Sequence, residues 1–207
     1  MLKLYYAVGT CALASHIALE ETSANFETVR IDFRTEDQLK PEFLAINPKA
    51  RVPALVTDHG VLTETPALLV YIAQSFPHAR LAPLENAFEL ARVQAFNSYL
   101  CSTVHVAHSH RMRGYRWADD PVALKEMQRK VPDTISECFA LIEREMFEGP
   151  WVMGKAYTIC DPYLFTLAQF LEGDGVDLAR LPKIRDFRNH MAERAAVKRA
   201  LANESAQ

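Results

Sequence analysis

A cysteine near the amino terminus is the first residue whose position suggests chemistry. Cys11 follows Gly9 and Thr10 and opens a run with helical spacing, so we expect Thr10 to be the N-cap and the thiol to lie in the first helical turn. A helix amino terminus favours an anion, and the thiolate is the form of cysteine that attacks other sulfur compounds. The pattern predicts a reactive thiol, and a small buried side chain is the alternative.

Two further segments carry groups that suit an extended peptide ligand. Val52 precedes Pro53 at the start of an expected strand, and a cis bond there would leave the Val52 backbone open to pair with a ligand as an added strand does. Glu64 can accept hydrogen bonds from an ammonium group, and Thr65, as N-cap before Pro66, would open a helix start that binds a carboxylate. These groups suit the zwitterionic end of a γ-glutamyl peptide, and ordinary helix capping is the alternative.

A third set of candidates lies on a helical stretch of the second half. Ser98, Ser102 and His105 are four and three residues apart and so are expected on one helix face. His105 would reach a cleft and act on a sulfur, or would be ordinary polar surface. Together with His108 and His110 it resembles a metal cluster, but only His105 and His108 share a face, so we expect no metal site.

Two parts of the chain with different periodicity must position these residues. Up to about residue 76, strand-like runs alternate with helical ones. The expected elements are a strand at 2–6, a helix at 11–22, a strand at 26–32, a hairpin of 53–57 and 61–63, and a helix at 66–76. This βαβ, irregular, ββα order is that of a thioredoxin-like domain. We therefore predict an α/β N-terminal thioredoxin-like domain over residues 1–76.

The remainder of the chain has the pattern of an all-α C-terminal helical domain. Residues 77–85 contain two prolines and are the expected linker, and residues 86–207 form the expected helical domain. Apolar residues recur at helical spacing in 86–116, 120–147, 161–173 and 183–202. Thr158 and Asp161 have capping-box spacing, which we interpret as a folding signal.

The overall composition favours a small-molecule partner. With 49% hydrophobic residues among 207, the chain can bury a core, and 23 basic against 26 acidic residues indicate neither nucleic-acid nor membrane binding. The first residues lack signal-peptide features and no apolar run reaches a membrane-spanning length, so we expect a cytoplasmic protein. The four cysteines form no CxxC pair and are expected to be free thiols.

These motifs resemble those of cytosolic glutathione S-transferases, most closely the cysteine-bearing bacterial beta class. The resemblance spans the chain and rests on several segments. They are Tyr6, Gly9, Cys11, Asn47-Pro48-Lys49, Arg51-Val52-Pro53-Ala54-Leu55, Leu62-Thr63-Glu64, the contact helix 97–105 and the signature 158–165. Thr65 departs from the glycine or serine common in that class and adds a methyl group near the ligand.

The resemblance implies a glutathione transferase that conjugates glutathione, its co-substrate, to small hydrophobic electrophiles held against the helical domain. It further implies a detoxifying homodimer without another cofactor, with Tyr6 in a supporting role. Cys11 and His105 take the catalytic roles. The implied substrate-binding residues are Cys11, Val52, Glu64, Thr65, Ser98, Ser102 and His105, with Ser98 near the ligand of the neighbouring subunit.

Two other activities fit the same residues. Cys11 would support glutathione-dependent thiol-disulfide exchange, for which one cysteine is sufficient. The alternative of another class is a noncatalytic, transferase-like regulatory or scaffold protein, because this fold also supports interaction roles.

Overall fold

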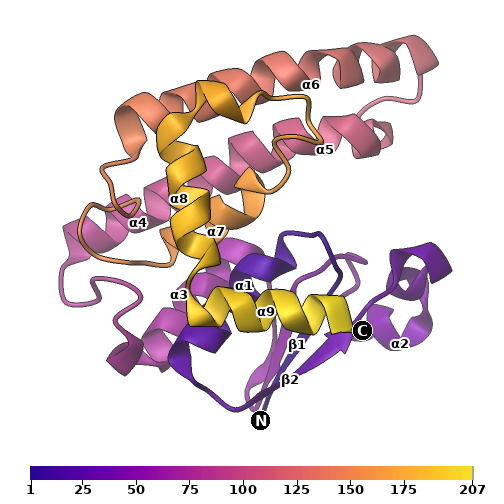
Figure 1. Ribbon diagram of the computed structural model, residues 1–207. Coiled ribbons are helices and arrows are strands. Elements are labelled where there is room, and N and C mark those ends of the chain that lie inside the picture. The colour runs from indigo at the N-terminus through magenta and orange to yellow at the C-terminus, as the bar shows by residue number, and fades with distance from the viewer. Residues whose placement is uncertain (207) are drawn as a thin grey trace.

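A four-stranded mixed sheet organises the first part of the molecule (Figure 1). The structure is a computed structural model that describes residues 1–206. The strands are β1 (Leu2–Tyr6), β2 (Phe26–Arg30), β3 (Ala54–Thr57) and β4 (Gly60–Thr63), in the order β2-β1-β3-β4. β1 and β2 are parallel because α1 (Ala12–Thr22) crosses between them, and the other pairs are antiparallel. The predicted α/β thioredoxin-like arrangement is confirmed.

The predicted hairpin is also confirmed, with β3 one residue shorter and β4 one residue longer than expected. Asp58 and His59 form its two-residue turn, and Gly60 follows with φ of 130°, a conformation that glycine adopts readily. α3 (Thr65–Ser75) then packs on α1. Between β2 and β3 lie three short helical segments that the sequence pattern left irregular: η1 (Phe33–Thr35), η2 (Asp37–Leu39) and α2 (Pro41–Leu44).

Helices make up the second part of the chain, as predicted. They are η3 (Pro77–Ala79), α4 (Ala87–Tyr99), η4 (Leu100–Val104), α5 (His105–Arg113), η5 (Gly114–Arg116), α6 (Pro121–Leu141), η6 (Ile142–Met146), α7 (Cys160–Ala168), η7 (Leu178–Arg180), α8 (Pro182–Ala192) and α9 (Ala195–Ala206). η4 and η6 are π-helical turns that continue α4 and α6. No helix within residues 1–206 is both long and apolar enough to cross a bilayer.

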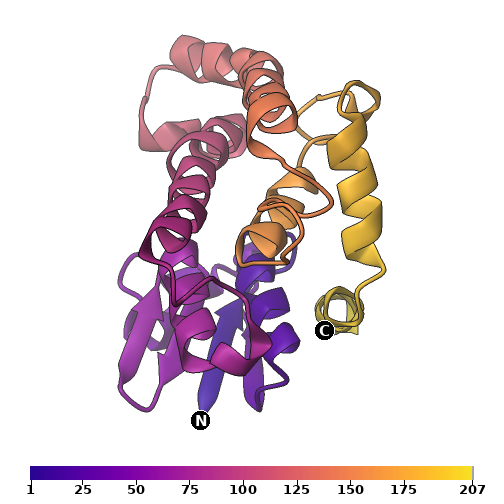
Figure 2. The same cartoon turned by 90° about the vertical axis from the view of Figure 1, so that its left-hand side faces the viewer.

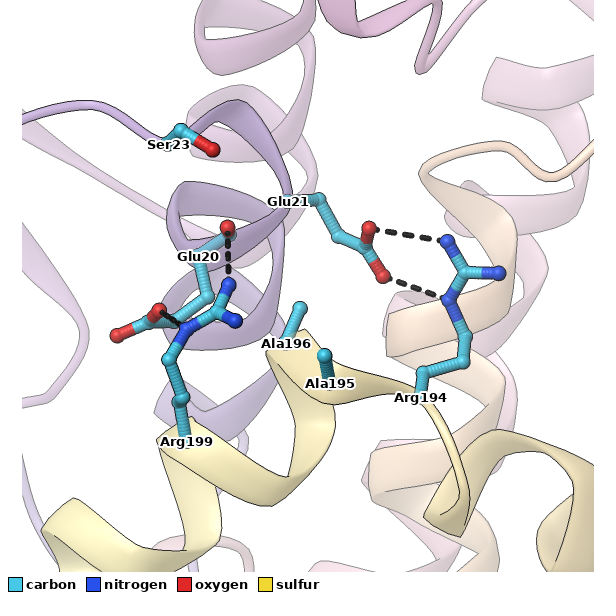
Figure 3. A pocket seen from close by; sticks show the side chains of 7 residues that line it. All are labelled: Glu20, Glu21, Ser23, Arg194, Ala195, Ala196 and Arg199. Carbon is cyan, nitrogen blue, oxygen red and sulfur yellow. Dashed lines mark hydrogen bonds and ion pairs between the residues drawn. The ribbon is translucent and has the colours of Figure 1, made fainter.

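The apolar stretch 183–202 contains two helices, because the chain turns between α8 and α9. Both views show α9 leaving the helical layer and returning to the level of the sheet (Figures 1 and 2). There Arg194 forms a bidentate ion pair with Glu21 of α1, at 2.6 and 2.9 Å, and Arg199 pairs with Glu20 (Figure 3). No glycine or proline marks this turn, so only packing against α1 determines it.

The predicted capping motif before α7 is a buried hydrogen-bond network around Asp161. The carboxylate accepts the N–H of Thr158 at 2.7 Å and that of Val152 at 2.8 Å. The Thr158 hydroxyl accepts the Cys160 N–H at 3.3 Å. Burial raises the pKa of Asp161 to about 7. The motif therefore ties the start of α7 to the preceding loop, which agrees with a role in folding.

The burial of His16, on α1, leads to a prediction of how the free energy of unfolding depends on pH. Its side chain is fully buried between the rings of Tyr6 and Phe26, and neither ring nitrogen has a hydrogen-bond partner in residues 1–206. Burial lowers its pKa below the ordinary value. The folded state therefore binds fewer protons than the unfolded state, and stability should fall as the pH drops below about 6.5.

We expect that in His16→Leu the free energy of unfolding decreases less on acidification, because the buried histidine no longer contributes to that decrease. The measurement is the free energy of unfolding by urea at pH 7.5 and pH 5.5 for the protein and the variant. His59→Gln, at an exposed position, is the control. If the free energy of unfolding decreases equally on acidification in His16→Leu and in the unmodified protein, the expectation is contradicted.

Candidate functional site

Cys11 lies at the start of α1, in the turn formed with Gly9 and Thr10. The Thr10 hydroxyl accepts the Ala12 N–H at 3.3 Å and donates to the Ala7 carbonyl at 2.7 Å. The predicted capping by Thr10 is thus present, but α1 begins at Ala12 and Cys11 itself is the N-cap residue. The thiol donates to the Val52 carbonyl at 3.7 Å.

The protonation state of Cys11 differs from the expectation. Burial raises the pKa of the thiol above its ordinary value, and the Thr65 hydroxyl and the Arg113 guanidinium only partly oppose this effect. The resting thiolate predicted from the helix amino terminus is therefore wrong, because loss of solvation outweighs the helix-start field. At neutral pH Cys11 is a thiol and a hydrogen-bond donor.

The backbone at Val52 has the geometry that the sequence predicted. The Val52–Pro53 bond is cis, and β3 begins only at Ala54. The Val52 N–H makes no hydrogen bond within residues 1–206, although the residue as a whole is buried. The N–H and the carbonyl of Val52 thus take no part in the sheet ladder, and the carbonyl is directed toward Cys11.

Glu64 and Thr65 differ from the prediction by one position. Glu64 is the N-cap of α3 and has φ of 75°, which is unusual for a residue other than glycine, and Thr65 is the first helical residue. Such backbone strain is concentrated at functional sites. Thr65 is buried, and its hydroxyl interacts with the Cys11 thiol. The Glu64 carboxylate forms an ion pair with Lys49, whose ammonium also donates to Thr63 at 2.6 Å.

His105 is partly buried, with its ring 6.1 Å from that of His108. Burial, together with electrostatic interaction with His108, Arg113 and other arginines, lowers its pKa to about 4. It is therefore neutral at physiological pH. No hydrogen bond joins it to Cys11 within residues 1–206, so the pairing of these two side chains stays a prediction.

Ser98 and Ser102 are exposed, and the Ser102 hydroxyl donates to the Ser98 carbonyl at 2.8 Å. The π-helical turn η4 lies between α4 and His105 and interrupts the regular spacing on which the expectation of a shared face depended. Only His105 of the three is turned toward the interior.

The structure also brings together residues that the sequence pattern did not select. Cys101, on η4, and Tyr163, on α7, both lie within the electrostatic influence of Cys11. Arg113, in the last turn of α5, also acts electrostatically on Cys11. Tyr163 was missed because it belongs to an apolar helix in which a tyrosine is counted as core.

Other candidates do not join this site. The ring of Tyr6 is completely buried against His16, which is consistent with a supporting role. His108 forms a pair with Asp174 at 2.7 Å. Within the described part of the chain, no three histidine, cysteine, aspartate or glutamate side chains lie close enough to hold a metal ion.

Comparisons with known proteins give the same family over different lengths of the chain. The profile described as the glutathione S-transferase N-terminal domain matches residues 1–74. Glutathione S-transferase GstA of Escherichia coli O157:H7 is 30% identical over 205 residues, or 98% of each chain. The crystal structure of a glutathione transferase homologue from Sulfitobacter, with bound glutathione, has a TM-score of 0.95 at 43% identity and covers 100% of this chain and 99% of its own.

A bacterial beta class glutathione S-transferase from Sphingomonas chungbukensis is also similar. Its structure has a TM-score of 0.86 at 31% identity and covers 99% of this chain and 100% of its own. The full-length match to GstA and the cysteine at the start of α1 agree with each other. This chain belongs to the glutathione S-transferase family.

Proposed function

We propose that this protein is a glutathione transferase that binds its co-substrate with Cys11, Val52, Glu64 and Thr65. The observation that carries the proposal is the 3.7 Å contact between the Cys11 thiol and the Val52 carbonyl. It brings a sulfur next to a strand-like backbone with an unused N–H. A cysteine-containing tripeptide would pair with Val52 and direct its own sulfur toward Cys11.

The γ-glutamyl end of glutathione would bind at the start of α3. Its carboxylate suits the free N–H groups there, and its ammonium suits the Glu64 carboxylate. Lys49 now occupies that carboxylate, so the ligand ammonium would share or displace it. The unusual backbone at Glu64 would hold the carboxylate for this contact.

In the conjugation reaction, the protonated Cys11 would donate a hydrogen bond to the glutathione thiolate. That thiolate would attack a small hydrophobic electrophile held against α4 and α5, forming a carbon-sulfur bond as the leaving group departs with the electron pair. Stabilisation of the sulfur anion by such donors is the main catalytic effect expected. His105, neutral and partly buried, would lie on the electrophile side.

Thiol-disulfide exchange is the second activity we propose, because Cys11 itself is a free thiol. After loss of its proton to solvent, Cys11 would attack the glutathione sulfur of a mixed disulfide and release the other thiol. A second glutathione would attack the resulting Cys11–glutathione disulfide. The products are glutathione disulfide and the regenerated Cys11 thiol, so no further oxidant or reductant is required.

Calorimetry with glutathione, together with assays of aryl-halide conjugation and mixed-disulfide reduction, tests this proposal. We expect saturable binding and turnover in at least one assay. A protein that binds no glutathione and is inactive in both assays would instead be a noncatalytic regulatory or scaffold member of the family.

Glu64→Gln tests the ammonium site. We expect it to raise the KM for glutathione about 10–100-fold, because a charge-assisted hydrogen bond is lost, with a smaller change in the KM for the electrophile. Lys49→Met is the matched control, since it removes the internal ion pair but leaves the carboxylate. Equal increases in both variants would mean that Glu64 acts only through Lys49.

The remaining family features are part of the same proposal. Residues 1–76 would form the glutathione-binding domain, 77–85 the linker, and 86–207 the helical domain that lines the electrophile site. We propose a cytoplasmic, detoxifying, beta-class homodimer, with Ser98 near the ligand of the neighbouring subunit. The exposure of Ser98 on α4 and of Val61 on the edge strand β4 supports such packing. Sedimentation equilibrium measures the oligomeric state.

A further inference from the structure

His108 and Asp174 form a pair that joins α5 to the turn after α7. The His108 Nδ1 atom lies 2.9 and 2.7 Å from the two oxygens of the Asp174 carboxylate, whose side chain is only 2% exposed. An ionised carboxylate accepts hydrogen bonds and donates none, so the Nδ1 atom carries the hydrogen. The buried carboxylate therefore fixes both the orientation and the tautomer of the imidazole.

The second ring nitrogen of His108 is accessible. Within residues 1–206 the Nε2 atom makes no hydrogen bond, and the side chain is 19% exposed. It is not sealed in the core, as both ring nitrogens of His16 are. An imidazole with one nitrogen held by a carboxylate and the other accessible has the arrangement of a general acid or base, because the carboxylate stabilises the imidazolium.

Three partly exposed rings lie together on this side of α5. The rings of His105 and His108, three residues apart on the helix, have centroids 6.1 Å apart, and the Phe170 ring stacks on His108 at 4.3 Å. Aromatic side chains with a few polar groups among them are the usual lining of a small-molecule site. The three rings thus form a continuous wall that extends from His105, on the electrophile side, to the His108 Nε2 atom.

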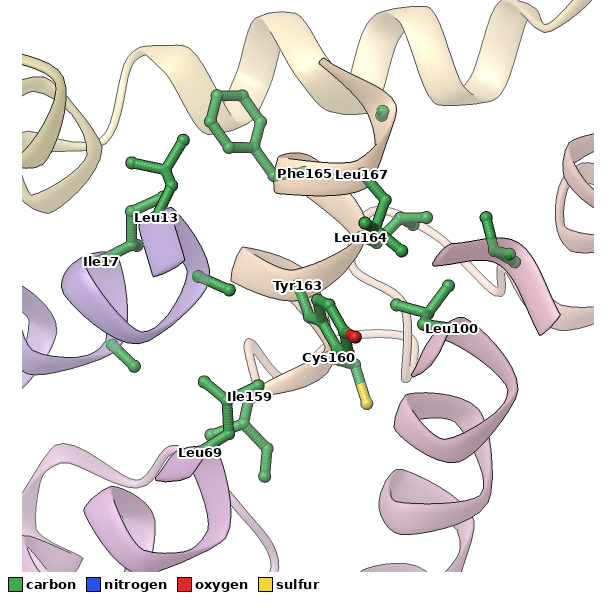
Figure 4. Close-up of a cluster of buried hydrophobic side chains, with 14 of the residues drawn as sticks. Leu13, Ile17, Leu69, Leu100, Ile159, Cys160, Tyr163, Leu164, Phe165 and Leu167 are labelled. Atoms are coloured by element: carbon green, nitrogen blue, oxygen red, sulfur yellow. The ribbon is translucent and has the colours of Figure 1, made fainter. Parts of the chain in front are cut away.

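The turn that carries Asp174 follows a firmly packed helix. Figure 4 shows α7 with Leu13 and Ile17 of α1 on one side and Leu100 on the other, all of them buried. On the α5 side, the Arg111 Nε atom lies 3.4 Å from the Asp174 carboxylate. The carboxylate is therefore held from both helices, and a group on such fixed elements is well positioned for chemistry.

We propose that His108, oriented by Asp174, is a general acid of this protein and that its electrophiles include α,β-unsaturated carbonyl compounds. The inference rests on the proposed function and deepens it, because it names a substrate class for the same site. His108 is then a catalytic residue that touches the electrophile, and Asp174 is a positioning residue that acts through His108.

The proposed step balances without a further reactant. The glutathione thiolate forms a carbon-sulfur bond at the β-carbon, and the electron pair of the carbon-carbon double bond moves toward the carbonyl oxygen. That oxygen takes the Nε2 proton of the His108 imidazolium. The resulting enol becomes the ketone by proton exchange with solvent, from which His108 also recovers its proton. An aryl halide needs no such acid, since its leaving group departs with the electron pair.

His108→Gln tests the proposal, because glutamine can still donate a hydrogen bond to Asp174 but cannot release a proton. The measurement is kcat for conjugation of glutathione to benzylideneacetone, an α,β-unsaturated ketone, and to an aryl halide. We expect kcat to fall about 100-fold with the ketone and to change less than about twofold with the aryl halide. An equal fall with both substrates overturns the proposal.

His110→Gln is the matched control. His110 lies on the same helix, but its ring packs edge-on against Trp117 at 4.7 Å and forms no ion pair within residues 1–206. We expect this variant to keep kcat with both substrates. If the His108 and His110 variants lose ketone turnover equally, or if His105→Gln loses it and His108→Gln does not, the assignment to His108 is overturned.

Asp174→Asn tests the positioning role. Asparagine keeps an acceptor for the Nδ1 hydrogen of His108 but removes the charge that stabilises the imidazolium. We expect kcat with the ketone to fall about tenfold at an unchanged KM, because a charge-assisted hydrogen bond becomes a neutral one. The kcat with the aryl halide should stay the same. If Asp174 only ties α5 to the turn after α7, both substrates lose turnover together, which contradicts the proposal.

A measurement on the unmodified protein applies even if Asp174→Asn does not fold. We expect kcat to be lower in heavy water than in ordinary water with the ketone, because a proton is transferred in the transition state, and to differ less with the aryl halide. Equal ratios for the two substrates contradict the proposal.

Failure of the inference can be distinguished from failure of the proposed function. Calorimetry on the unmodified protein reports on glutathione binding alone, and a protein that binds no glutathione loses both. A protein that binds glutathione but does not turn over the ketone, or turns it over equally well as His108→Gln, retains the proposed function and loses only this assignment.

Discussion

Replacing Cys11 with alanine should lower the rate of glutathione mixed-disulfide reduction by about 1000-fold or more. The exchange reaction passes through a covalent bond to the Cys11 sulfur, and removal of an enzyme nucleophile leaves only binding effects. Conjugation should fall by less, about tenfold, because there Cys11 contributes one hydrogen bond to a sulfur anion. Parallel assays of the two activities, at saturating glutathione, measure both effects in one preparation.

The pH dependence of the exchange rate provides a second test of the role of Cys11. Since burial raises the pKa of Cys11, the rate of exchange should increase as the pH rises above neutrality, following the thiolate fraction. Conjugation by Cys11→Ala should lack this component. Cys138→Ala, at a buried cysteine on α6, serves as the control. Reduction that persists in Cys11→Ala at more than a tenth of the original rate would exclude Cys11 as the nucleophile.

The second large effect is expected on stability, from Asp161→Ala. This change leaves the N–H groups of Val152 and Thr158 buried without an acceptor and opens a small cavity at the start of α7. Each unsatisfied buried N–H costs about 1–3 kcal/mol, so the free energy of unfolding should fall by roughly 3–5 kcal/mol. Urea denaturation followed by circular dichroism measures the change.

Asp161→Asn separates the hydrogen bonds from the charge. Asparagine keeps one acceptor oxygen, so we expect a smaller loss than with alanine, about half of it. Asp133→Ala, at an exposed position on α6, should change stability by less than about 0.5 kcal/mol. A loss below about 1 kcal/mol in Asp161→Ala would mean that other groups satisfy these amides.

The fold of the first part of the chain was predictable because its signals are local. Alternation of apolar and polar residues indicates β2, and the residues Asp58, His59 and Gly60 indicate the hairpin turn. By contrast, the turn between α8 and α9 has no glycine or proline. It depends on ion pairs of Arg194 and Arg199 with α1, which is far away in the sequence, and no local pattern contains that information.

The same distinction applies to the helical part. Its four apolar stretches were recognisable from their spacing, but the π-helical turn η4 was not, because it depends on how the helix packs against α5, α6 and α7. This turn interrupts the face shared by Ser98, Ser102 and His105. A prediction made from regular helical spacing therefore holds only as far as the helix stays regular.

The sequence by itself determined that Cys11 lies at the start of a helix and that Val52 precedes a proline at a strand start, because both features depend on adjacent residues. Only the tertiary structure decided that the Val52–Pro53 bond is cis, that the thiol is protonated at rest and that the Thr65 hydroxyl interacts with it. The physical reason is that solvation and electrostatic interaction depend on distance in space, and packing brings these groups together from distant parts of the chain.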